Sequence, residues 1–172
     1  VSPDAFDRGG TKLALINGVY DLERHELLPH SPDHLLTLGV GYAYDPKAKC
    51  PRFQQFLEEV LVRHSDPDDD TSPLVPDPEL RLLVQEMIGY CLTTHCRAER
   101  GFFLLGHGRN GKSRLLGVIR QLLGEHNVCD AFDLHRLAYS NSNMRLLGKL
   151  AALGIEQKQG VLMNEAAYKA FV

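Results

Sequence analysis

The chain has 172 residues, 44% of them hydrophobic, and a formal net charge of −3, which allows one large or two small domains with a substantial core. No run of about 18 apolar residues is present, which argues against a membrane span, and residues 1–10 lack the basic and apolar regions of a signal peptide. The negative charge balance gives no overall indication of nucleic-acid binding.

Cysteine usage favours a cytoplasmic protein. No C-x-x-C pair is present, so we expect reduced cysteines rather than a disulfide or zinc framework. The sequence also lacks an initial Met, and we therefore expect it to be a fragment of a longer protein. The four cysteines are Cys50, Cys91, Cys96 and Cys129.

The first part of the chain predicts a hairpin followed by helices. Residues 12–22 form two short apolar runs around Asn17-Gly18, a strong signal for a tight β-hairpin. Amphipathic helices are expected to begin at Pro51 and Pro78, and their apolar stripes should pack together. We therefore predict a mostly helical N-terminal domain over residues 1–97, beginning with the hairpin.

Between these two helices lies the acidic, proline-rich segment 65–78. Asp66, Asp68 and Asp70 resemble the start of a calcium loop, but its sixth position is Thr71 rather than Gly and its twelfth is Asp77 rather than Glu. A solvated surface loop is the better interpretation.

Residues 106–113, GHGRNGKS, fit the phosphate-loop pattern G-x-x-x-x-G-K-[ST]. The glycines allow backbone N–H groups to point at a phosphate chain. Lys112 would contact the β- and γ-phosphates of ATP, and the Ser113 hydroxyl would ligate Mg²⁺. The expected nucleotide-binding residues are Gly106, His107, Gly108, Arg109, Asn110, Gly111, Lys112 and Ser113.

The sequence around this loop agrees with a P-loop core. Residues 101–106 are apolar and bounded by glycines, which suits a buried parallel strand. Residues 112–124 place their leucines and isoleucine on one face of a helix that should stop at Gly124. We therefore predict the first part of an α/β P-loop NTPase core, with a parallel sheet, over residues 98–172.

Nucleotide hydrolysis usually needs an acid at the end of a neighbouring strand. Glu156 follows the apolar run 150–155 and is the candidate for holding the Mg²⁺ shell and polarising water, although a plain solvated Glu is the alternative. Asp130 and Asp133 are rivals without a preceding apolar strand, in a segment predicted to form a short helix. Glu165 is a weaker rival inside a predicted last helix.

Several motifs together resemble the phage and plasmid DNA primase family, in the region that joins a poxvirus-type primase N-terminal domain to a superfamily 3 helicase core. The resemblance runs from about residue 12 to the end of the chain. It rests on the segments NGVYDL, PHSPD, YAYDPKAKCPRF, QEMIGYCLT, FFLLGHGRNGKS and LLG, in that order.

The resemblance implies an ATP-driven, AAA-like helicase of mobile-element replication that acts on single-stranded or forked DNA, usually as a homo-hexamer. Residues 106–113 would be its Walker A loop, with Asn110 at the family's characteristic Asn, and Glu156 its Walker B acid. Asn164, Glu165 and Lys169 match a pattern that precedes the family's DNA-contacting segment. That segment, the sensor residue and the arginine finger are absent here, so we expect weak nucleotide binding and no unwinding by this chain alone.

Two other functions are compatible with the sequence. The chain could be a non-catalytic interaction or helicase-loading module with a remnant nucleotide site. A small-molecule phosphotransferase is less attractive, because nothing downstream of the loop indicates an Arg-rich substrate lid.

Overall fold

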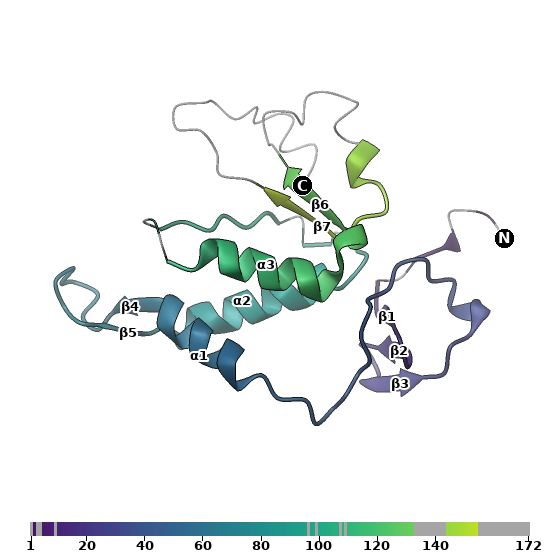
Figure 1. Ribbon diagram of the computed structural model, residues 1–172, viewed down its shortest axis with the longest axis horizontal. Coiled ribbons are helices and arrows are strands. Elements are labelled where there is room, and N and C mark those ends of the chain that lie inside the picture. The colour runs from purple at the N-terminus through teal and green to yellow at the C-terminus, as the bar shows by residue number, and fades with distance from the viewer. Residues whose placement is uncertain are drawn as a thin grey trace.

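The computed structural model describes residues 2, 5–8, 10–95, 97–98, 100–106, 108, 110–132 and 144–154 (Figure 1). Its secondary structure mixes helices and short strands. In chain order, the strands and α-helices are β1 (Lys12–Leu15), β2 (Gly18–Asp21), β3 (Glu26–Leu28), α1 (Pro51–Val60), β4 (Val62–His64), β5 (Leu74–Pro76), α2 (Pro78–Cys91), α3 (Lys112–Leu123), β6 (Val128–Phe132) and β7 (Ala151–Gly154).

The predicted N-terminal hairpin is confirmed. Strands β1 and β2 pair antiparallel, with Leu15 opposite Gly18, and β3 adds a third antiparallel strand beside β2. Gly18 has φ +153°, and a Cβ there would lie 2.5 Å from the Leu28 carbonyl oxygen, so the turn needs glycine. Asp21 closes the far end of β2, where its carboxylate accepts the N–H groups of Arg24 and Glu23, and the bond from Arg24 is the main cause that lowers the pKa of Asp21.

The two predicted helices are also confirmed, and both begin at their prolines. Helix α2 is capped by Asp77, which accepts the backbone N–H groups of Glu79 and Leu80. Helices α1, α2 and α3 lie against one another (Figure 1) and share one hydrophobic core. The buried members of this core are Leu57, Val84, Met87, Leu115, Ile119, Leu123 and Val128.

Strands β6 and β7 pair parallel, and Val128 lies opposite Ala151. The apolar run that precedes Glu156 is thus a strand, as predicted. The short helix predicted over residues 130–137 is wrong at its start, because β6 runs through Asp130 to Phe132 and buries Cys129 and Phe132; residues 133–137 lie outside the described residues.

The predicted strand over residues 101–106 is wrong as well. This segment has no regular secondary structure, and Phe102, Phe103 and Leu105 are 42%, 55% and 87% exposed. The parallel sheet in the described part of the chain contains β6 and β7, and neither pairs with residues 101–106. Strand formation depends on pairing and packing with neighbouring strands, so an apolar composition does not by itself make a segment a strand.

Within the described ranges, every helix is too short or too polar to cross a lipid bilayer.

Candidate nucleotide site

The phosphate-loop segment leads directly into a helix. Gly111 has φ +83° and occupies the N-cap position, and α3 begins at Lys112 as predicted. The helix ends at Gly124, whose N–H donates to the Arg120 carbonyl, so the predicted stop is confirmed too. Gly106, at the other end of the loop, has φ +147°. Both loop glycines therefore adopt backbone conformations that residues with a side chain rarely reach.

Gly111 is also fixed by its neighbours in α1. A Cβ at this position would lie 2.8 Å from Val60 Cγ1 and 3.1 Å from Phe56 Cε2. The end of α1 therefore presses on the start of α3, and only glycine fits between them. The sequence pattern requires glycine here for the phosphate contact, but it gives no sign of this second, steric reason.

Lys112 folds back over the loop that precedes it. Its ammonium Nζ donates to the carbonyl oxygen of Gly106 at 2.7 Å and to Asn110 Oδ1 at 2.7 Å. These two acceptors lie four positions apart, so the lysine ties the first residue of the loop to Asn110. A phosphate oxygen entering the loop would find the cation already positioned there.

The start of α3 favours an anion. Gly111 offers no side-chain cap and the first turn contains no acidic residue, so no carboxylate competes for the first N–H groups. The positive end of the helix dipole points the same way. Ser113 is exposed in this first turn, where its hydroxyl could reach a metal ion bound beside a phosphate.

Among the remaining predicted residues, some lie within the described residues and others lie outside them. Gly108 is described and exposed, and a Cβ there would meet no atom within 4 Å. Other predicted residues lie outside the described residues, although β7 ends at Gly154, just before Glu156. They are His107, Arg109, Asp133, Glu156, Asn164, Glu165 and Lys169.

Asp130, considered as an alternative acid, is engaged elsewhere. Its carboxylate lies 3.0 Å from the guanidinium of Arg120, in the last turns of α3, and Arg120 also lies 3.4 Å from Glu125. The phosphate loop is at the other end of this helix. Asp130 therefore joins β6 to the end of α3 rather than facing the loop.

The acidic segment between α1 and α2 forms a hairpin that the sequence did not predict. Strands β4 and β5 pair antiparallel on either side of it. Asp66 accepts the N–H of Asp68, and Asp69 accepts both the N–H and the hydroxyl of Thr71, whose hydrogen bonds lower the pKa of Asp69. The described residues contain no group of three or more potential metal ligands.

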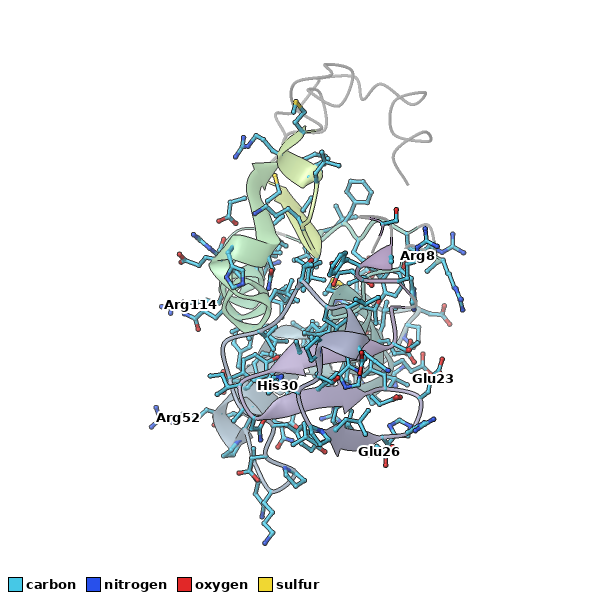
Figure 2. All side chains as sticks on the ribbon, turned by 90° about the vertical axis from the view of Figure 1, so that its right-hand side faces the viewer. Arg8, Glu23, Glu26, His30, Arg52 and Arg114 are labelled. Carbon is cyan, nitrogen blue, oxygen red and sulfur yellow. The ribbon has the colours of Figure 1, made fainter. Side chains whose placement is uncertain are left out.

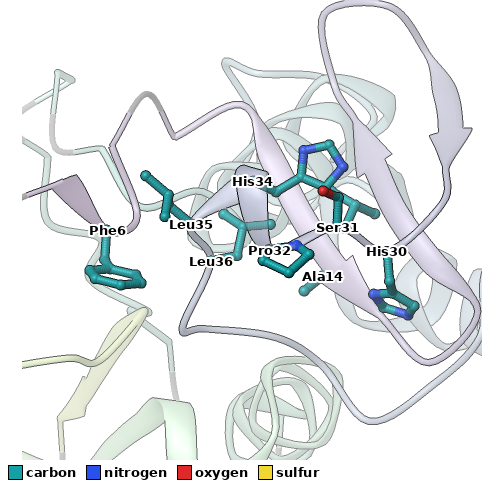
Figure 3. A pocket seen from close by; sticks show the side chains of 9 residues that line it. Phe6, Ala14, His30, Ser31, Pro32, His34, Leu35 and Leu36 are labelled. Atoms are coloured by element: carbon teal, nitrogen blue, oxygen red, sulfur yellow. The ribbon is translucent and has the colours of Figure 1, made fainter. Parts of the chain in front are cut away.

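An open cavity of about 450 Å³ is lined by residues from Phe6 to Leu36 (Figure 3). None of the predicted loop residues lines it. The histidines that line it already form hydrogen bonds within the chain. His34 bonds with Lys12 Nζ at 3.4 Å and the Pro29 carbonyl at 3.2 Å, and His30 bonds with the Ile16 carbonyl at 3.3 Å. The cavity thus lacks the convergent unused polar groups typical of a ligand site.

Comparison with known proteins gives a family match at the start of the chain and a similarity to a viral protein. Residues 1–62 match the family described as "D5 N terminal like". Over 124 residues the chain is 25% identical to a protein of Acanthamoeba polyphaga mimivirus whose name reads "Putative helicase". The aligned region covers 70% of this chain and 12% of the viral protein. The family match lies in the part of the chain where the sequence resembles a poxvirus-type primase N-terminal domain.

Proposed function

We propose that this chain is a segment of an ATP-dependent replicative DNA helicase and that residues 106–113 bind Mg·ATP. The observation that supports this most directly is the loop geometry. Lys112 spans Gly106 and Asn110, and Gly111 turns the chain into the start of α3. This arrangement places a cation and a helix N-terminus at one point, which suits the terminal phosphates of a nucleotide.

In this proposal the chain's residues have distinct roles. Lys112 exchanges its loop acceptors for β- and γ-phosphate oxygens and neutralises the charge that develops on the transferred phosphoryl group. Ser113 holds Mg²⁺, and Glu156 orients the attacking water. When bound there, Mg²⁺ would supply positive charge that offsets the charge of the phosphates. The intact protein would assemble as a homo-hexamer on single-stranded or forked DNA.

A non-catalytic loading module remains the alternative. The exposure of Phe103 and Leu105, directly before the loop, favours it, because a working P-loop core normally buries the preceding strand. Under this alternative, the region that matches the known family would supply partner contacts and the loop would bind nucleotide feebly or not at all.

Thermal unfolding with different nucleotides tests the proposal. A ligand at about 100 times its Kd stabilises the folded state by about 2.7 kcal/mol. For a domain of this size that corresponds to a rise in Tm of roughly 5 to 10 °C. We expect this rise with Mg·ATP and no rise with AMP, which lacks the β- and γ-phosphates. Equal shifts with both nucleotides, or a shift with neither, would contradict a phosphate loop.

A further inference from the structure

A cluster of exposed cations lies at the end of the segment that connects β3 to α1 and in the first turn of α1. Lys47, Lys49 and Arg52 are all exposed, and none of them forms an ion pair with another described residue. By contrast, Arg24, Arg81 and Arg120 each face a carboxylate. This local excess of positive charge is hidden by the overall charge of −3.

Nearby acidic groups do not neutralise the cluster. Asp45 accepts the backbone N–H of Lys47 at 2.8 Å, and residues 44–52 keep a net positive charge, with three cations and this one carboxylate. Glu58 pairs with Arg81 at 2.9 Å, and Glu59 accepts from Gln55 at 2.9 Å, both in the second half of α1. In Figure 2, Arg52 projects from the molecule on the side opposite Glu23 and Glu26.

The cations are also unfavourable for α1, because they lie at its start. Helix α1 has Arg52 in its first turn, no acidic residue there, and no side-chain cap from Cys50. Helix α2 shows the stabilising arrangement, with Asp77 as cap and Glu79 in the first turn. Local helix stability therefore does not explain the basic residues of segment 47–52.

An aromatic side chain lies at the other end of the same segment. Tyr44 is 37% exposed and its ring centroid lies 4.6 Å from that of Tyr20. The backbone of Tyr44 is held to the hairpin turn by two hydrogen bonds of 2.9 Å with the Asn17 side chain. A side-chain hydrogen bond with Tyr44 is the main cause that raises the pKa of Tyr20.

We propose that Tyr44, Lys47, Lys49 and Arg52 form a contact surface for single-stranded nucleic acid. The cations pair with successive phosphates, and the anchored tyrosine offers a face on which an unstacked base can stack. Bases within a duplex are already stacked, so the aromatic contact selects the single strand. Arg114, in the first turn of α3, projects on the same side as Arg52 (Figure 2), which brings the strand along the side of the molecule that holds the start of α3. This surface rests on the proposed replication function for its biological role, but its chemistry does not require the nucleotide site.

Fluorescence anisotropy with a labelled 20-nucleotide oligothymidylate tests the surface. The triple variant Lys47→Gln/Lys49→Gln/Arg52→Gln should bind about tenfold or more weakly at low salt. Its slope of log K against log [salt] should be about 2 smaller, at about 0.7 for each lost phosphate contact. Tyr44→Leu should weaken binding with the salt slope unchanged. The matched control Arg24→Gln/Arg63→Gln/Arg97→Gln removes the same charge from exposed positions elsewhere and should bind like the wild type.

Several outcomes would overturn this inference. They are absence of oligothymidylate binding by the wild type, equal loss in both triple variants, and equal affinity for a duplex of the same length. The same variants are also titrated with Mg·ATP. Retained ATP binding by the basic-segment variant separates a failure of this surface from a failure of the nucleotide site.

Discussion

Replacing Gly111 with valine is expected to abolish Mg·ATP binding and to destabilise the fold by about 3 kcal/mol. The new Cβ would lie 2.8 Å from Val60 Cγ1, closer than non-bonded carbons approach. The φ of +83° is in addition strained for a β-branched residue. Overpacking and backbone strain typically cost about 1 to 3 kcal/mol each. Urea unfolding and calorimetric titration measure the two effects.

Gly117→Val is the matched control, because it introduces the same side chain into the same helix. A Cβ at Gly117 would meet no atom within 4 Å, and this position lies beyond the loop. Valine and glycine differ little in helix propensity, so the control should unfold within about 0.5 kcal/mol of the wild type. If Gly111→Val bound Mg·ATP as well as this control, the loop geometry described here would be wrong.

Replacing Asn127 with alanine is expected to cost about 3 kcal/mol. Asn127 is 0% exposed, and its Nδ2 donates to the Gly39 carbonyl at 2.7 Å and to the Leu123 carbonyl at 2.8 Å. It thus joins the end of α3 to the chain beside the N-terminal sheet, where Val40 donates to Ala14. Alanine would leave two carbonyls without this donor, and each lost buried partner costs about 1 to 3 kcal/mol.

The exposed Asn17 provides the comparison for Asn127. Its side chain also makes two backbone hydrogen bonds, both with Tyr44, but water can replace them. Asn17→Ala should therefore lower the free energy of unfolding by about 1 kcal/mol or less. Chemical denaturation measures the free energy of unfolding of both variants. An equal loss would show that Asn127 does not link the end of α3 to the chain beside the N-terminal sheet.

Local signals predicted much of the fold. The Asn17-Gly18 turn, Pro51 and Pro78 at helix starts, and Gly124 at a helix end all act within a few residues of chain. The elements that the sequence did not predict correctly depend on contacts with distant parts of the chain. Strand β3 shows no alternation of buried and exposed residues, and residues 101–106 have strand composition without a strand beside them.

The candidate site shows the same difference between local sequence signals and contacts with distant residues. The loop pattern predicts a phosphate site at the glycines, Lys112 and Ser113 from the sequence alone, because in known phosphate loops the ligand restricts those positions. It could not reveal that Lys112 bonds to Asn110, or that Phe56 and Val60 confine Gly111. Those contacts depend on side-chain direction and helix packing, which one sequence does not encode locally.

Calorimetric titration of Mg·ATP into the wild type, Lys112→Ala and Lys112→Arg tests the central claim most directly. The wild type should bind and Lys112→Ala should lose at least about tenfold in affinity, because a charge-assisted phosphate contact is worth about 1.5 to 3 kcal/mol. Lys112→Arg should recover part of that loss through its charge. Equal affinity of all three proteins, or no binding by the wild type, would contradict a phosphate site at residues 106–113.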